Sequence, residues 1–185
     1  TDDRFAPAHF DETLELDLWQ MLTYTYDDSD GDGYGDAKFY RNGRLIGGGS
    51  GIAAPQPWSD FRLYKINGFL DDVRVYNCEL TRAEIGDLHE GPPAEEQFVL
   101  HWEFEGNGDA ILDSSGNENH ADINDGVFVS DPERGNVLYA ADGSGAMKTD
   151  AAVNGMDVSL PFTVAFWLKP EKLDSYTQRV GTDWG

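Results

Sequence analysis

The stretch NGFLDDVRVYNCELTRAEIGDL, residues 67–88, contains the two signals that decide the fold. Its first part, FLDDVRVY at 69–76, alternates with a period of two, as a β-strand does. The alternation predicts a strand with Val73 and Val75 on one face and Leu70 on the other. Strand signals of this kind recur along the chain and indicate its fold class.

The second part of the stretch predicts a short helix over 81–90. Thr81-Arg-Ala-Glu84 has the pattern of a capping box, in which the Thr81 hydroxyl accepts from the Glu84 amide and the Glu84 side chain reaches back. Ile85 and Leu88 then fall on one face, and Gly91-Pro-Pro ends the helix near residue 90. Extended helical periodicity is otherwise nearly absent from the chain.

Alternation also predicts strands on both sides of this stretch. AKFYRNGRLI at 37–46 predicts a hairpin, because Asn42-Gly43 favours a type I′ turn between two strands. The other predicted strands cover residues 18–26, 60–66, 98–104, 126–129, 136–140, 145–149 and 162–168. Many short strands, glycine-rich turns and one capped helix predict an all-β fold, an antiparallel β-sandwich.

Two segments resemble halves of the laminin-G-like (concanavalin A-like) jelly roll, in reversed order. LWQMLTYTYD at 18–27, KFYRNGRLIGG at 38–48 and the stretch at 67–88 resemble the family's second half. VLHWEFEGN at 99–107, DSSGNENHAD at 113–122 and LPFTVAFWLKP at 160–170 resemble its first half. The resemblance implies a division into residues 1–92, the end of one jelly roll, and residues 93–185, the start of the next.

The reversed order leaves two arrangements open. A single sheet needs a second layer to bury its apolar face, so neither half is expected to fold alone. In the first arrangement the halves form one circularly permuted sandwich, joined by GPPAEEQ at 91–97. In the second, each half is completed by a neighbouring molecule through strand exchange.

The charge of the chain disfavours two classes of partner. Its 35 Asp and Glu residues against 13 Lys and Arg residues give a formal net charge of −22 at pH 7. Such a surface repels nucleic acid and anionic membranes, and no apolar run is long enough for membrane insertion. Cys78 is the only cysteine, so no intrachain disulfide can form. In a secreted or cell-surface protein, metal ions are then the usual means of holding the loops.

The strongest local signal is the acidic segment DSDGDGYGD at 28–36. Oxygen donors at alternate positions around a glycine reproduce most of a calcium loop. These donors are the side chains of Asp28, Asp30, Asp32 and Asp36 and the main-chain carbonyl of Tyr34. Phe39 stands where an EF-hand has its bidentate Glu, and the segment instead resembles the helix-free loops of thrombospondin type 3 and dockerin repeats. We expect calcium here, and the alternative is a polar, flexible turn.

The jelly-roll resemblance implies a second calcium site. In related jelly rolls a structural calcium often ties the first strands to the last one, and the resemblance assigns that role to Asp72 and Asp113. The alternatives are an Asx turn at Asp113 and a salt bridge from Asp72 to Arg74.

Sugar binding requires aromatic side chains beside hydrogen-bonding groups. The aromatic residues that lie in polar, loop-like stretches, and are therefore the candidates for ligand contact, are Trp58, Tyr34 and Trp184. Those that lie in predicted strands, and are more often core residues, are Trp19, Trp102 and Trp167.

Signals of catalysis are weak, and we expect no enzymatic activity. The segment from Glu15 to Gln20 is similar to the paired-acid strand of some jelly-roll glycosidases, but Gln20 stands at the second acid and cannot exchange a proton at neutral pH. The four histidines show no zinc spacing, and the chain has no Gly-x-Ser-x-Gly motif.

Together these features predict an extracellular, calcium-dependent adhesion module that binds carbohydrate or protein. The first alternative is a structural subunit, in which half-domains complete each other by self-association to build a surface filament or layer. The second alternative is a fragment of a polysaccharide-degrading enzyme.

Overall fold

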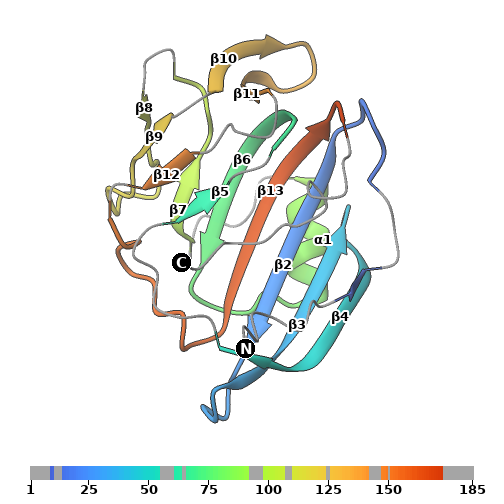
Figure 1. The fold of residues 1–185 in the computed structure, drawn as a ribbon, viewed down its shortest axis with the longest axis vertical. Coiled ribbons are helices and arrows are strands. Elements are labelled where there is room, and N and C mark those ends of the chain that lie inside the picture. The colour runs from blue at the N-terminus through green and yellow to red at the C-terminus, as the bar shows by residue number, and fades with distance from the viewer. Residues whose placement is uncertain are drawn as a thin grey trace, which may run out of the picture.

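A computed structural model describes residues 9–10, 14–54, 61–63, 66–91, 98–106, 110–123, 126–141, 147–149 and 151–172. Within these residues the protein consists of two antiparallel β-sheets and one helix (Figure 1). The prediction of an all-β sandwich is confirmed. None of the helical structure described is long and apolar enough to cross a membrane.

In the described part of the chain, the larger sheet contains nine strands. In spatial order they are β1 (His9–Phe10), β4 (Arg44–Ala53), β3 (Tyr34–Arg41), β2 (Gln20–Asp27), β13 (Phe162–Pro170), β6 (Gly68–Tyr76), β11 (Gly135–Ala140) and β10 (Gly126–Asp131), with β7 (Phe98–Trp102) paired to β6. The smaller sheet contains β5 (Arg62–Leu63), β12 (Met147–Thr149), β9 (Ala121–Ile123) and β8 (Ala110–Ile111). Most predicted strands are present, with ends that differ by a few residues.

Strand β13 lies between two strands from the other side of Pro92 (Figure 1). It pairs with β2 from Phe162 opposite Tyr26 to Leu168 opposite Gln20. On its other edge it pairs with β6 over most of its length. Strands from residues 1–92 and from residues 93–185 therefore share one sheet.

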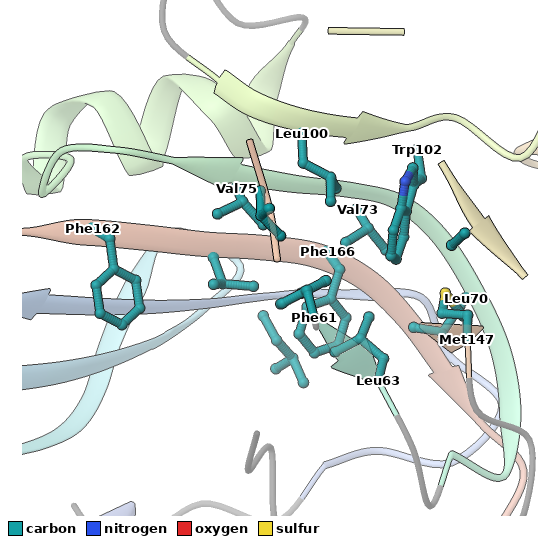
Figure 2. Packing of buried hydrophobic residues seen from close by; sticks show 14 of the residues in the cluster. Phe61, Leu63, Leu70, Val73, Val75, Leu100, Trp102, Met147, Phe162 and Phe166 are labelled. Atoms are coloured by element: carbon teal, nitrogen blue, oxygen red, sulfur yellow. The ribbon is translucent and has the colours of Figure 1, made fainter. Parts of the chain in front are cut away.

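The main core lies between the two sheets and contains side chains from both segments of the chain (Figure 2). Phe61, Trp102 and Phe166 are among its largest members, and each is at most 2 % exposed. The ring centroids of Phe61 and Trp102 are 5.6 Å apart. The predicted core role of Trp102 is confirmed.

Helix α1 (Arg82–Glu90) covers part of the opposite face of the larger sheet (Figure 1). The predicted capping box is present, with the Glu84 amide donating to Thr81 Oγ1 at 3.3 Å and the Thr81 amide donating to Glu84 Oε2 at 2.7 Å. Ile85 and Leu88 are buried against this face in a second, smaller cluster. The sheet therefore has two buried faces in this region, and most residues of β2 and β13 are buried on both sides.

The sequence pattern predicted the turn at Asn42-Gly43 correctly but not the details of strand β6. Asn42 and Gly43 have φ values of 50° and 74°, as the predicted type I′ turn between β3 and β4 requires. The strict alternation predicted for 69–76 is wrong, because Leu70, Val73 and Val75 all lie in the main core. A β-bulge at Asp72, where φ is 55°, shifts the register opposite Phe166.

Candidate functional site

The acidic loop, residues 28–36, connects β2 to β3 and is organised by hydrogen bonds between its own groups. The amides of Asp32, Gly33 and Tyr34 donate to the side chains of Asp30, Asp28 and Asp32 at 3.3, 3.1 and 2.8 Å. Gly31 and Gly33 adopt positive φ values of 68° and 87°, which glycine allows without strain. These bonds hold the loop in a tight, curled conformation.

Three carboxylates converge inside this loop. Asp28, Asp30 and Asp32 each have an oxygen within 4.8 Å of the other two. Asp30 and Asp32 are exposed, but Asp28 is only 5 % exposed. Asp28 Oδ1 is buried and none of the described residues donates a hydrogen bond to it. Asp27, at the end of β2, has a second buried oxygen of this kind.

The donor set fits a hard cation. Calcium binds six to eight oxygen atoms in flexible geometries, and carboxylates are its usual protein ligands. A buried carboxylate oxygen that receives no hydrogen bond, as Asp28 Oδ1 is among the described residues, is unfavourable unless a positive charge compensates it. Asp28, Asp30 and Asp32 would hold the ion.

The remaining predicted positions of the loop lie at the start of β3. Asp36 is exposed and pairs with Asp27 across the β2–β3 ladder, outside the group of three converging carboxylates. Tyr34 has a side chain that is 59 % exposed, and it pairs with Ala53 of β4. A role for its carbonyl and for Asp36 in binding calcium stays a prediction.

The structure brings the second predicted pair, Asp72 and Asp113, to the two sides of His101. His101 Nε2 lies 2.8 Å from Asp72 Oδ1, and the His101 amide donates to Asp113 Oδ1 at 2.8 Å. Both carboxylates therefore have partners from the protein.

Asp113 organises the turn that follows it. It accepts from the amides of Ser115 and Asn119 and from the Ser115 hydroxyl, at 3.0, 2.9 and 2.7 Å. These bonds lower the pKa of the Asp113 carboxyl although burial, the largest influence, raises it. The Asx-turn alternative for Asp113 matches this geometry, and shared calcium binding with Asp72 stays an untested prediction.

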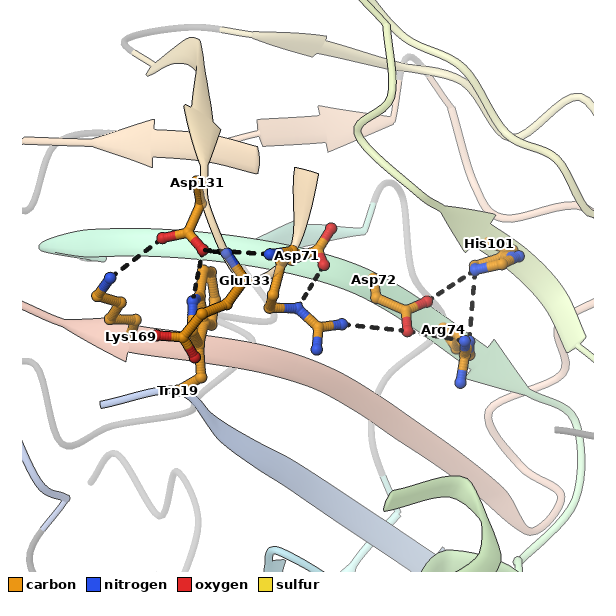
Figure 3. A network of polar contacts seen from close by, with 9 residues as sticks. Trp19, Asp71, Asp72, Arg74, His101, Asp131, Glu133 and Lys169 are labelled. Carbon is orange, nitrogen blue, oxygen red and sulfur yellow. Dashed lines mark hydrogen bonds and ion pairs between the residues drawn. The ribbon is translucent and has the colours of Figure 1, made fainter. Parts of the chain in front are cut away.

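A charged cluster lies on the outer face of the larger sheet (Figure 3). It contains the salt bridge from Asp72 to Arg74 that the sequence offered as an alternative, but its other members were not predicted. It consists of Asp71, Asp72, Arg74, His101 and Arg134. Arg134 Nε lies 2.5 Å from Asp71 Oδ2, and Arg74 Nη2 lies 2.7 Å from Asp72 Oδ2. The bulge at Asp72 allows both aspartates to avoid the core, which strict alternation does not permit.

Arg134 is also held between two indole rings. Its guanidinium carbon lies 4.3 Å from the ring centroid of Trp167 and 5.5 Å from that of Trp19. The Trp19 indole donates to Asp131, which also binds Lys169 at 3.1 Å and caps the turn before Arg134 (Figure 3). Trp19 and Trp167 are half-buried and lie outside the main core. Their predicted core role is therefore wrong for the sandwich interior, although Trp167 packs against the second cluster on the outer face.

The two neighbouring aspartates have opposite pKa shifts. Burial raises the pKa of Asp71 to about 6, although Arg134 acts in the other direction. Burial also acts to raise the pKa of Asp72, but the hydrogen bond from His101 and the charges of Arg74 and Arg134 outweigh it and lower that pKa.

We therefore expect Asp71→Asn to change how stability depends on pH. The carboxyl of Asp71 retains its proton more strongly in the folded state, so its contribution is complete below pH 4 and is lost as the pH rises through 6. The difference between the ordinary pKa of 3.8 and the pKa of about 6 in the folded protein corresponds to about 3 kcal/mol in the free energy of unfolding. Urea unfolding of both proteins between pH 4 and 7 should show a decline in wild-type stability that the variant lacks. Parallel curves would contradict the prediction.

Ser114 completes a chain of hydrogen bonds like that of serine hydrolases. Its hydroxyl lies 3.0 Å from His101 Nδ1, and His101 Nε2 in turn contacts Asp72. The two nearest amides, however, are engaged, since Ser114 donates to the His101 carbonyl and Ser115 to Asp113. They are not available as oxyanion donors, so we propose no catalytic role for Ser114.

Of the three aromatic candidates for ligand contact, only Tyr34 is described. Its exposed side chain borders the acidic loop. Trp58 and Trp184 lie outside the described residues.

The fold and the acidic loop define a β-sandwich protein, and the described residues contain a candidate metal site in that loop. Residues 2–86 match a laminin G family model. This family belongs to the concanavalin A-like lectin/glucanases superfamily. No curated protein and no solved structure matches the chain. The laminin-G-like resemblance is thus confirmed for this segment, and the assignment of residues 93–185 stays a prediction. The superfamily supports a carbohydrate- or protein-binding module in general, but it also includes glycosidases.

Proposed function

We propose that this protein is an extracellular, calcium-dependent module that binds carbohydrate or protein ligands. The buried Oδ1 of Asp28, which receives no hydrogen bond from the described residues and lies beside the carboxylates of Asp30 and Asp32, is the observation that carries the proposal. Three negative charges at this spacing repel each other unless a cation lies among them. The net charge of −22 and the single cysteine, which allows no intrachain disulfide, also favour an ion that holds the loops.

Calcium is expected to raise the melting temperature of the wild-type protein, because it binds the folded loop and not the unfolded chain. At a calcium concentration one hundred times the Kd, the gain is about 2.7 kcal/mol. For a chain of this size that corresponds to roughly 5 to 10 °C. Thermal melts with excess calcium and with a chelator measure the difference.

Asp28→Asn is the sharpest variant for this test. The amide keeps the acceptor for Gly33 but removes the buried charge. In chelator the variant should melt at or above the wild-type temperature, and calcium should no longer raise it. Asp157→Asn is the control, since Asp157 accepts from Ser159 in a similar turn but is not one of the three converging carboxylates. Equal melts of the wild type with and without calcium would remove the calcium proposal.

We also propose that residues 1–92 and 93–185 are the late and early parts of one permuted jelly roll. The position of β13 between β2 and β6 supports this arrangement. So does the shared core, in which Trp102 of β7 packs with Val73 of β6. In the alternative, β13 is exchanged between molecules. This arrangement predicts that the mass measured by light scattering increases with protein concentration. One permuted sandwich predicts a monomer.

A further inference from the structure

We propose that the outer edge of β10 is a docking site for an extended segment of a partner protein, which adds to the larger sheet as a further strand and carries basic residues at its ends. The site is separate from the acidic loop, because β13, β6 and β11 lie between β2 and β10 in the sheet. Three properties of β10 support the inference: its position, its uncharged sequence and the acidic groups near both of its ends.

Strand β10 is the longest of the four strands that end the two described sheets. The other three, β1, β5 and β8, have two residues each, whereas β10 has six. One edge of β10 pairs with β11 over its whole length. Its other edge pairs with no strand in the described part of the chain, and β10 lies at the margin of the molecule in Figure 1. Such an edge offers a row of amide and carbonyl groups to a further strand.

The sequence of β10 lacks the features that usually protect an edge strand. Proteins block exposed edges with charged residues, proline or β-bulges. Residues 126–130, GVFVS, contain no charged residue and no proline, and their register with β11 is uninterrupted. The side chain of Val127 is 56 % exposed. This edge therefore suits β-augmentation, in which main-chain hydrogen bonds supply affinity and alternate side chains supply specificity.

The two faces of β10 indicate which side chains the partner strand should carry. Phe128 packs against the main core, so its neighbours Val127 and Val129 lie on the outer face of the sheet. Tyr139 of β11 is opposite Val127, is half-buried, and has its ring 4.9 Å from that of Phe69. A strand added beside β10 would extend this apolar surface with every second side chain. We therefore expect β-branched apolar residues at the centre of the partner segment.

Acidic side chains lie near both ends of β10. Asp122 is exposed in β9, which precedes β10, and Glu133 is exposed in the turn that follows it. Glu105 is also exposed, and its carboxylate lies against Gly135 at the same turn. The uncharged strand is therefore flanked by negative charge.

Two basic side chains near this turn are already ion-paired. Arg134 pairs with Asp71, and Lys169 pairs with Asp131. The chain as a whole has a net charge of −22, so a second copy is repelled, whereas a segment with Lys or Arg at its ends is attracted. Charge complementarity thus favours a basic partner over self-association at this edge.

Binding of a labelled peptide tests the inference on the intact chain. The probe is fluorescein-labelled Lys-Lys-Val-Thr-Val-Thr-Val-Lys-Lys, followed by fluorescence anisotropy. We expect saturable binding with a Kd that is the same within about twofold in calcium and in chelator. The peptide with Glu in place of every Lys should bind at least about tenfold more weakly. N-methylation of two successive central residues blocks both edges of the Lys peptide without changing its charge, and it should also weaken binding about tenfold or more.

A substitution on the edge strand locates the site. Val127→Lys places a charge on the exposed edge and should weaken peptide binding about tenfold. Leu112→Lys is the control, because Leu112 is 66 % exposed, lies outside β10 and changes the net charge by the same amount. Its Kd should stay within about twofold of the wild type. In the wild type, the bound peptide should slow amide hydrogen exchange within residues 126–130.

Each contrary result has a defined meaning. Absence of saturable binding, equal binding of the doubly methylated peptide, or an equal loss in Leu112→Lys would overturn the docking site. If the peptide-free wild type forms a dimer that Val127→Lys abolishes, the occupant is a second copy and the proposed partner class is wrong. Because the comparison is made in calcium and in chelator, these results leave the calcium proposal to its own melting experiment.

Discussion

Trp102→Ala is expected to lower the free energy of unfolding by about 3–5 kcal/mol, the range for a fully buried Trp. Trp102 is completely buried, and its indole nitrogen donates to the Asn119 carbonyl at 2.8 Å. The substitution therefore leaves a cavity in the main core and a buried carbonyl without its donor. The melting temperature, followed by circular dichroism, should fall by roughly 10 °C.

The shape of the transition is as informative as its midpoint. Trp102 pairs with Val73 of β6 and contacts the ring of Phe61, both from residues 1–92. If the two segments share one interior, the variant should unfold in a single transition that is shifted as a whole. Leu112→Ala is the control, because Leu112 is 66 % exposed and should change little. Two transitions, of which only one moves, would show that the segments fold separately.

Arg134→Ala should lower the free energy of unfolding by a comparable amount, for a different reason. Removing one partner of a buried ion pair costs about 3–5 kcal/mol, because the other charge stays buried without compensation. Arg134 pairs with Asp71, which is 5 % exposed, and lies between the rings of Trp19 and Trp167. The alanine variant loses both the charge and the stacked contact.

The cost of Arg134→Ala should shrink in acid. The pKa of Asp71 is already about 6 with Arg134 in place, and its removal raises that pKa further. At pH 5 the carboxyl is then mostly neutral and needs no cation, so the loss of stability measured in urea should be smaller than at pH 7.5. Glu133→Ala, an exposed neighbour, is expected to show no such difference. A cost of Arg134→Ala that is independent of pH would contradict the pairing.

The local signals in the sequence predicted local structure well. The capping box at Thr81 and the type I′ turn at Asn42-Gly43 depend on groups within a few residues of each other, and both are present. Period-two alternation predicted most of the strands, because strands with a buried face require it. The convergence of Asp28, Asp30 and Asp32 also follows from their spacing around Gly31 and Gly33.

These local patterns could not predict the ion pair between Asp71 and Arg134 in the charged cluster. Arg134 lies more than sixty residues from Asp71 in the chain, and nothing in the segment around it signals a buried ion pair. Strict alternation places Asp71 and Asp72 on opposite faces, but the bulge at Asp72 breaks that alternation. A bulge is set by the pairing of β6 with β13, which only the assembled sheet defines.

The sequence by itself thus determined the fold class, the helix and the acidic loop, because hydrogen bonds and side-chain periodicity over short distances are encoded in adjacent residues. The tertiary structure decided which segments share a sheet, that Asp113 binds amides of its own turn, and that Arg134 neutralises Asp71. The physical reason is that these features depend on burial and on partners distant in the chain, which are established only when the two sheets enclose one core.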